Sequence, residues 1–199
     1  MFGDATRRVG RMLKMTVQAL KPVTADEFLD WATDRQGPRY ELFRGRPVQM
    51  APERAAHADA KLNLAIALRM AARGTDAHVY PDGMSVVVDS GNVFEPDTLV
   101  RLGGPLPGDT VKVADPIIIG EILSPSTSRI DVTAKLVGYF TISSLHHYLV
   151  VDAKAHTLTH YHRDATGEVI GNVISEGILM LDPPGLSLDV GQVFEGLRD

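Results

Sequence analysis

The 199-residue sequence predicts a mixed α/β (α+β) fold with a central sheet and helices on its faces. Three observations lead to this expectation. Segments 25–34 and 57–72 carry apolar residues at helical spacing. Segment 117–123 is a nearly continuous run of β-branched residues, which is typical of a strand covered on both faces. Shorter strand-like segments lie on both sides of that run, so helices and strands alternate along the chain.

The composition excludes several classes of protein. Hydrophobic residues make up 44% and charged residues 23%, as in a soluble globular domain and unlike a disordered chain. The absence of cysteine excludes a disulfide scaffold, a thiolate metal site and a cysteine nucleophile, and it fits a cytoplasmic location. No apolar run approaches the roughly 20 residues that span a bilayer, so we expect no membrane helix.

Charge is distributed unevenly along the chain. Residues 1–21 contain five bases and one acid, a net charge of +4. Because the whole sequence has a net charge of −5, residues 22–199 carry −9. We therefore expect a basic N-terminal extension over 1–21, with a true start near Met15 or with an arm that orders on a partner. Residues 22–199 are expected to form a single domain. Because that domain is acidic, nucleic-acid binding would need a local patch, metal ions or the extension.

Individual elements follow from local signals. Thr24 and Glu27 form a capping box that starts the first helix, and Gly74 ends the second. A glycine turn at 44–46 indicates a hairpin. The expected ranges are helices 25–34, 57–72 and 130–141; hairpin strands 39–43 and 47–50; strands within 79–102; a loop at 103–110; and strands 117–123, 147–151, 157–161 and 169–173.

The central strand carries one charge, Glu121, and a buried carboxylate needs a partner or a metal ion. A second acid, Asp97, precedes another strand-like segment, and neighbouring strands could bring the two acids together. Two carboxylates at close range repel unless a cation lies between them. An all-oxygen site of this kind suits Mg²⁺ or Mn²⁺. Lys135 lies on the following helix, on the same face as Asp131 and Tyr139.

Several motifs occur in the order of a known family. They are Tyr40-Glu41-Leu42, Glu95-Pro96-Asp97, Gly120-Glu121-Ile122-Leu123-Ser124-Pro125-Ser126-Thr127, Asp131-Val132-Thr133-Ala134-Lys135, Tyr139-Phe140, His147 to Asp152, and Pro184 to Leu188. Over about residues 22–195 the sequence resembles the Uma-type family of restriction-endonuclease-like proteins, within the PD-(D/E)xK nuclease superfamily. The resemblance implies a mixed central β-sheet flanked by helices.

The resemblance also implies a site. Asp97 would be the PD aspartate and Glu121 the acid of the (D/E) position, both of them metal ligands. Leu123 stands where the parent motif has lysine, and Lys135 would supply the ammonium group from the helix. Glu41 would be an N-terminal catalytic acid, and His57 could face the same site. The implied activity is hydrolysis of DNA phosphodiester bonds by an endonuclease with Mg²⁺ or Mn²⁺.

Other interpretations of these residues remain open. The four site residues could have structural roles: Asp97 could start a strand, Glu121 could pair with Arg129 or Arg44, Lys135 with Asp131, and Glu41 with Arg39 or Arg46. The hydroxyls of 124–127 are better explained as helix caps than as nucleophiles. His156, His160 and His162 would share one face of a strand, but a zinc site there lacks supporting residues.

Alternatives also remain for the whole protein. It could be a non-catalytic binding or assembly module that keeps the nuclease fold, as the acidic domain and Leu123 suggest, or a hydrolase of another phosphodiester, such as a nucleotide. A homodimer is expected if both strands of a duplex are cut, with segment 144–151 contributing to the interface.

Overall fold

The computed structural model describes residues 21–33, 35–124 and 129–197. The predicted extension over residues 1–21 therefore lies outside the described residues except for Lys21. The helices are α1 (Ala25–Thr33), α2 (Ala55–Ala71), α3 (Arg129–Tyr139) and α4 (Val190–Val193). The strands are β1 (Tyr40–Phe43), β2 (Arg46–Gln49), β3 (Ala77–Pro81), β4 (Ser85–Asp89), β5 (Asn92–Phe94), β6 (Thr98–Leu102), β7 (Lys112–Val113), β8 (Ile118–Ile122), β9 (His147–Asp152), β10 (Thr157–Arg163), β11 (Val169–Ile174), β12 (Ile178–Leu181) and β13 (Leu186–Asp189).

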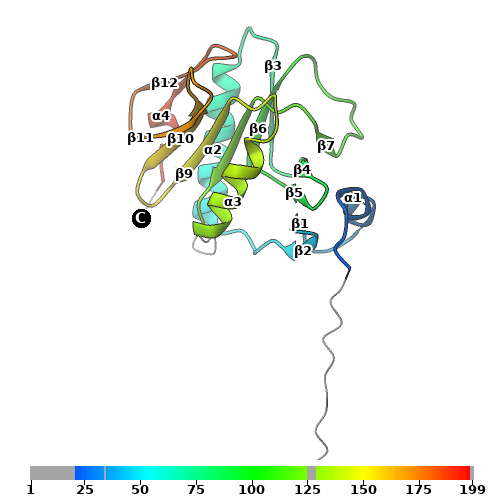
Figure 1. Cartoon of the computed structure of the whole chain (residues 1–199). Helices are drawn as coiled ribbons and strands as arrows, with labels where there is room; N and C mark the ends of the chain where they lie inside the picture. Colours follow the sequence, from blue (N-terminus) through cyan, green and yellow to red (C-terminus); the bar gives the residue numbers. More distant parts are fainter. Residues whose placement is uncertain (1–20, 34, 125–128, 198–199) are drawn as a thin grey trace, which may run out of the picture.

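The largest sheet has six strands in the order β11-β10-β9-β8-β6-β3 (Figure 1). The β8–β9 pair is parallel and the other pairs are antiparallel, so the sheet is mixed as predicted. Strand β8 lies inside this sheet, and Glu121 is its one residue that is not fully buried. The continuous apolar run at 117–123 therefore has the central position that its composition indicated.

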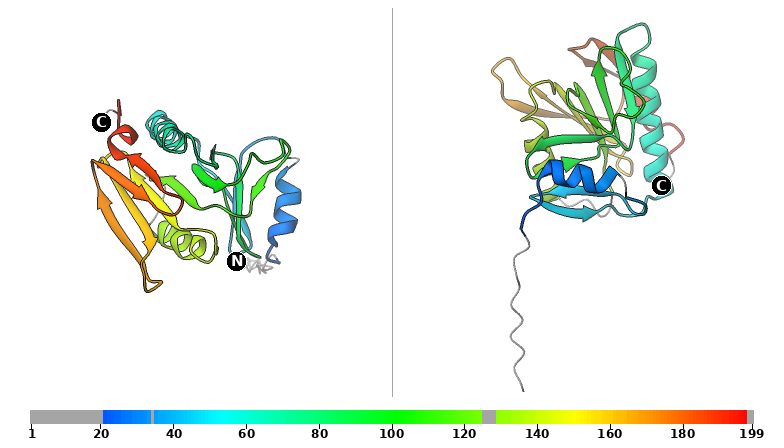
Figure 2. Two further views of the ribbon diagram at one scale, coloured as in Figure 1. Left: turned by 90° about the horizontal axis from the view of Figure 1, so that it is seen from above. Right: turned by 90° about the vertical axis from the view of Figure 1, so that its right-hand side faces the viewer.

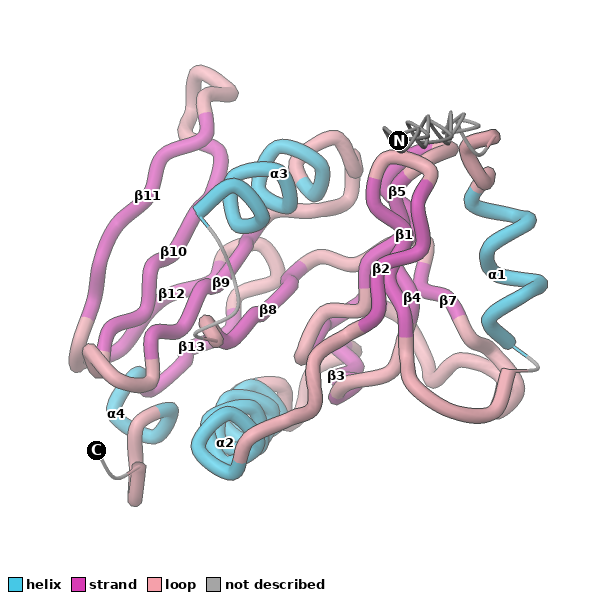
Figure 3. The backbone as a smooth tube through the Cα atoms, turned by 90° about the horizontal axis from the view of Figure 1, so that it is seen from below, coloured by secondary structure: helices cyan, strands magenta, loops and turns pink. Residues whose placement is uncertain are grey.

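Helices α2 and α3 cover opposite faces of the six-stranded sheet (Figures 2 and 3). Ile118 and Ile122 of β8 belong to the core cluster that contains α2, whereas Ile119 packs in the cluster with Tyr139 of α3. A Cβ on Gly120 would lie 2.7 Å from Leu64 Cδ2, so glycine allows α2 to approach the strand closely. Because side chains alternate along a strand, Glu121 points to the α3 face.

A second sheet of five strands, in the order β2-β1-β5-β4-β7, stands beside the first and is covered by α1 (Figure 3). The expectation of one central sheet was therefore incomplete, because the predicted hairpin belongs to this second sheet and not to the six-stranded one. Phe28 and Leu29 of α1 pack on Leu42 and Val93 of this sheet. The capping box is confirmed: the Thr24 N–H donates to Glu27 Oε2 at 2.9 Å, and the Glu27 N–H donates to Thr24 Oγ1 at 3.3 Å.

The C-terminal hairpin β12–β13 and the short helix α4 were not predicted. Alternate residues of the hairpin, Leu179, Leu181, Leu186 and Leu188, are buried in the cluster that also contains α2. The hairpin and α4 thus extend the apolar layer on the α2 side of the six-stranded sheet. Within the described part of the chain, no helix is long and apolar enough to cross a membrane.

One expectation about an interface was wrong. Segment 144–151 does not offer an interface, because β9 pairs with strands on both sides and His147 to Val151 are buried. On α2, the residues that bury against the sheet are Ala60, Leu64, Ala67 and Leu68. The apolar residues Leu62, Ile66 and Met70, whose spacing also predicted the helix, are exposed.

Candidate active site

Glu121 lies in β8, and Asp97 immediately precedes the neighbouring strand β6. Thr98 of β6 is opposite Gly120 of β8, so Asp97 and Glu121 lie at the same end of this strand pair. Asp97 is 7% exposed, and its Oδ2 accepts the backbone N–H of Ile122 at 2.7 Å. This hydrogen bond fixes one oxygen of Asp97 against β8. The pairing of β6 with β8 therefore brings the two acids to one end of the strand pair, and their role as metal ligands stays a prediction.

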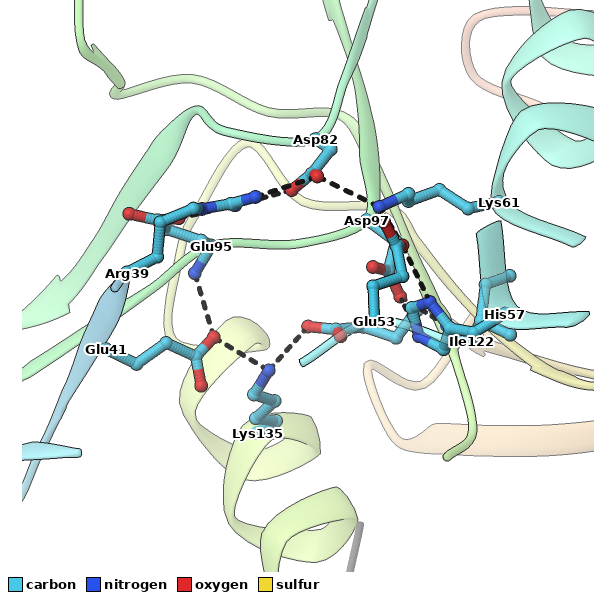
Figure 4. Close-up of polar contacts among 11 residues, drawn as sticks. Arg39, Glu41, Glu53, His57, Lys61, Asp82, Glu95, Asp97, Ile122 and Lys135 are labelled. Carbon is cyan, nitrogen blue, oxygen red and sulfur yellow. Dashed lines mark hydrogen bonds and ion pairs between the residues drawn. The ribbon is translucent and has the colours of Figure 1, made fainter. Parts of the chain in front are cut away.

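Lys135 reaches the acids from α3. Its Nζ donates to Glu121 Oε1 at 2.9 Å and to Glu41 Oε1 at 2.9 Å. The helix therefore supplies an ammonium group although Leu123 occupies the lysine position of the parent motif. Glu41 comes from β1 of the five-stranded sheet and also accepts the backbone N–H of Glu95 at 2.9 Å (Figure 4). The Lys135 side chain thus links α3 to both sheets.

Tyr139 is a site residue to which the sequence analysis gave no role. Its hydroxyl donates to Glu121 Oε1 at 2.8 Å, so this oxygen accepts from both Lys135 and Tyr139. The ring is fully buried and makes edge contacts with Phe94 and Tyr148. Burial raises the pKa of Tyr139 well above its ordinary value, so the hydroxyl remains a donor. The four-residue spacing from Lys135, one helical turn, was the available signal.

The start of α2 lies on the other side of Asp97. His57 Nε2 is 3.5 Å from Asp97 Oδ2, and His57 Nδ1 is 3.1 Å from Glu53 Oε1. The sequence expectation that His57 faces the site is consistent with these distances. Lys61, one turn later, pairs with Glu53 and with Asp82.

Asp82 connects these residues to the outer edge of the site. Arg39 donates to Asp82 and also to Glu95, forming a chain of ion pairs around the site that ends at a half-exposed guanidinium (Figure 4). Sequence reasoning missed Lys61, Asp82 and the role of Arg39, because these residues come from separate elements and belong to no recognisable motif.

Negative charge is incompletely balanced at the centre of the site. Burial, together with the nearby Glu41 and Asp97, raises the pKa of Glu121 to about 7 despite the opposing effect of Lys135. Burial also raises the pKa of Asp97, against the opposing effects of the Ile122 hydrogen bond and of the neighbouring Lys61 and Lys135. Burial disfavours the ammonium of Lys135, but Glu121 and Glu41 outweigh this effect and raise its pKa. The site therefore favours an additional cation beside its carboxylates.

Comparison with known proteins places the chain in a family. Residues 25–191, most of the sequence, match the Uma2 family, described as "Putative restriction endonuclease". The chain belongs to the Uma2 family. Two uncharacterised proteins of Synechocystis sp. (strain ATCC 27184 / PCC 6803 / Kazusa) are similar to this Uma2 protein. One, sll1609, is 28% identical over 75% of this chain and 85% of its own; the other, slr1290, is 26% identical over 88% and 93%.

A solved structure shares the fold. A crystal structure described as that of "a putative nuclease belonging to DUF820" from Anabaena variabilis ATCC 29413 superposes with a TM-score of 0.72. It covers 89% of this Uma2 chain and 100% of the other chain at 18% identity. The predicted restriction-endonuclease-like architecture is confirmed by this match.

The donor set of the Uma2 site fits a divalent cation that keeps much of its water. Restriction-endonuclease-like nucleases generally use divalent metals. Among residues 21–33, 35–124 and 129–197, no three histidine, aspartate or glutamate side chains are arranged as a ready-made metal cage. Mg²⁺ does not require such a cage, because it commonly binds through one or two carboxylates, with waters and substrate phosphate completing its shell. Asp97 and Glu121, with their elevated pKa values, match that mode.

The alternative pairings weighed from sequence have different outcomes. In the described part of the Uma2 chain, Glu121 is bonded to Lys135 and Tyr139 rather than to Arg44, and Glu41 to Lys135 rather than to Arg39 or Arg46. The Asp131 and Arg129 side chains lie outside the described residues, as do residues 125–128, which include most of the predicted hydroxyl cap.

The histidine triplet of this Uma2 protein does not share a strand face. Strand β10 begins at Thr157, so His156 precedes it, and the His156 ring stacks on Phe194. His160 instead bonds His147 at 2.9 Å, and His147 Nε2 lies 2.9 Å from the Pro183 carbonyl. The carbonyl can only accept, so His147 donates through Nε2 and accepts at Nδ1 from His160. Burial lowers the pKa of both rings to about 4, which keeps them in these neutral forms near pH 7.

Proposed function

We propose that this Uma2 protein is an endonuclease that hydrolyses phosphodiester bonds of DNA with Mg²⁺ or Mn²⁺ held by Asp97 and Glu121. The observation that carries the proposal is the convergence of two acids and a lysine, which come from the residue before β6, from β8 and from α3. Membership of a family described as "Putative restriction endonuclease" supports the same class of reaction. We propose the cytoplasm as the location, since DNA is the substrate.

Each residue has a defined task in this proposal. Asp97 and Glu121 would bind the ion, which polarises a phosphodiester oxygen, lowers the pKa of an attacking water and stabilises the developing negative charge. Lys135 would orient the water or neutralise charge on the phosphate as the bond breaks. Glu41 holds the Lys135 ammonium at the site, and Tyr139 fixes one oxygen of Glu121. The other Glu121 oxygen is then the one offered to the ion.

The geometry supports a site prepared for this chemistry before substrate arrives. Lys135, Glu41 and Glu121 have side chains between 14% and 18% exposed, so they are shielded from bulk water but still accessible. Electrostatic interactions are stronger in such surroundings than in water. A divalent ion would also offset the burial that raises the pKa of Asp97, and the burial and nearby acids that raise the pKa of Glu121.

The direct test is nicking of supercoiled plasmid in buffers containing Mg²⁺, Mn²⁺ or a chelator. We expect the wild type to nick DNA when either metal is present and Asp97→Ala to lose this activity. Asp76→Ala, at an exposed aspartate away from the site, is the matched control and should nick like the wild type. Equal nicking by the wild type and Asp97→Ala would end the proposal.

Two alternatives are separated by related measurements. A hydrolase of small phosphodiesters would cleave nucleotide substrates and leave both DNA and RNA intact. A non-catalytic module would bind neither metal nor substrate productively, and it is favoured by the net charge of −9 over residues 22–199 and by Leu123.

Cutting both strands of a duplex requires two sites, so we propose that the nuclease acts as a homodimer.

A further inference from the structure

Helix α2 presents an apolar stripe on the face turned away from the sheet. Leu62, Ile66 and Met70 follow one another at intervals of four residues and are 58%, 48% and 45% exposed. Leu64 and Leu68, on the other face of the same helix, are fully buried. Single exposed apolar residues are common on protein surfaces, but a continuous stripe along one helix face indicates an interaction surface.

The stripe ends in charges of opposite sign. Asp59 and Arg73 are both exposed, and each is seven residues from Ile66, in opposite directions. At 3.6 residues per turn, Asp59 lies within about 20° of Ile66 around the helix axis, and Arg73 directly follows the C-cap residue Ala72 at the end of α2. The stripe therefore runs from an acid through three apolar residues to a base, with Ile66 at its centre. Such an order is complementary to itself when the helix direction is reversed.

We infer that α2 is the surface through which two copies of this chain pair, with their α2 helices antiparallel about a twofold axis at Ile66. In this arrangement Ile66 meets the partner's Ile66, Leu62 lies beside the partner's Met70, and Asp59 approaches the partner's Arg73. The same contacts occur twice because a twofold interface uses one patch on both subunits. Each of the two charge pairs joins opposite signs, which favours a second copy over an unrelated partner.

The pairing leaves the candidate site uncovered. His57 lies nine residues before Ile66 and Lys61 five, which places both on the side of α2 opposite the stripe. Their side chains point to Asp97, Glu53 and Asp82 rather than to the helix surface that pairs (Figure 4). The dimer would therefore carry two open sites, one near each end of the antiparallel helix pair.

The size of the surface predicts a weak association. A 17-residue helix is about 25 Å long, and one helix pair buries less than the roughly 800 Å² per partner of a standard stable interface. We therefore expect a monomer–dimer equilibrium that depends on protein concentration. The inference does not rest on nuclease activity, because the oligomeric state is measured without DNA or metal.

The first test is sedimentation velocity of the full chain over a concentration series. The wild type is expected to shift from monomer to dimer as concentration rises. Ile66→Glu should raise the dissociation constant at least about 10-fold, because two buried carboxylates would face each other at the axis. Val137→Glu, at a 65% exposed valine of α3, is the matched control and should associate like the wild type.

A charge exchange tests the orientation of the helices. Asp59→Arg and Arg73→Asp should each weaken association, because each places like charges opposite one another, and the double variant should restore it. Because the chain has no cysteine, Ile66→Cys gives each copy a single thiol. A short bis-maleimide should then link two copies through position 66. A wild type that stays monomeric throughout would overturn the inference, as would a dimer insensitive to Ile66→Glu. Failure of the double variant to restore association would overturn the antiparallel arrangement.

Discussion

Lys135→Met is expected to reduce metal-dependent DNA cleavage by about 100- to 1,000-fold, the usual effect of removing one charge-stabilising donor from an active site. Among the residues that the structure describes, Lys135 is the cation that donates to Glu121, and its Nζ lies 2.9 Å from an oxygen of Glu121 and from one of Glu41. Methionine keeps much of the side-chain volume and removes only the ammonium. Cleavage rates measured at saturating Mg²⁺ would show whether the loss is in the chemical step.

The same substitution is expected to destabilise the fold in a pH-dependent manner. Breaking a buried ion pair costs about 3–5 kcal/mol when the remaining charge stays ionised. Because burial already raises the pKa of Glu121, protonation of that carboxyl would reduce the cost at low pH. Urea unfolding should therefore show a larger deficit at pH 8 than at pH 5. Lys154→Met, at an exposed lysine, is the control; cleavage by Lys135→Met at the wild-type rate would contradict the assigned role.

Glu121→Gln is expected to abolish divalent-metal binding while leaving the metal-free protein at least as stable as the wild type at pH 8. Glutamine retains an oxygen that can accept from Lys135 and Tyr139, but it removes the negative charge that an ion needs. Isothermal titration with Mn²⁺ measures the loss of binding, and urea unfolding with a chelator present measures stability. Glu176→Gln, at an exposed glutamate, should match the wild type in both measurements.

The sign of the stability effect follows from the pKa of Glu121. Its value is raised from 4.5 to about 7 on folding, so the folded state binds more protons than the unfolded state between those pH values. Ionised Glu121 therefore costs stability as pH rises through this window, by about 3 kcal/mol in all. Glutamine removes this cost. A variant that unfolds at a clearly lower urea concentration than the wild type at pH 8 would show that the Glu121 charge stabilises the fold instead.

The centre of the site could be predicted from sequence because its residues follow short-range rules. An acid within an apolar strand is conspicuous, and the pairing of β6 with β8 brings Asp97, just before β6, to the same end of the strand pair as Glu121. The position of Lys135 on the helix after β8 was visible from the resemblance. What sequence could not provide was the distance from Nζ to the carboxylates, which depends on how α3 packs over the sheet.

The missed residues depend on long-range packing. Arg39, Lys61 and Asp82 come from three elements, and nothing in their local sequences shows that they meet. The separate five-stranded sheet was missed for a similar reason, since a hairpin signal does not reveal which other strands will pair with it. On α2, both Leu64 and Ile66 fit a helical period, so spacing alone could not decide which face is buried.

The most direct measurement is a crystal of this protein soaked in Mn²⁺, with anomalous diffraction used to locate the ion. We expect one strong peak between Asp97 and Glu121, with a carboxylate oxygen of each at about 2.0–2.6 Å. The Lys135 ammonium should lie on the Glu121 side of the peak. Saturating Mn²⁺ that leaves no peak between these acids, or a peak bound by residues elsewhere in the fold, would contradict the assignment of this site.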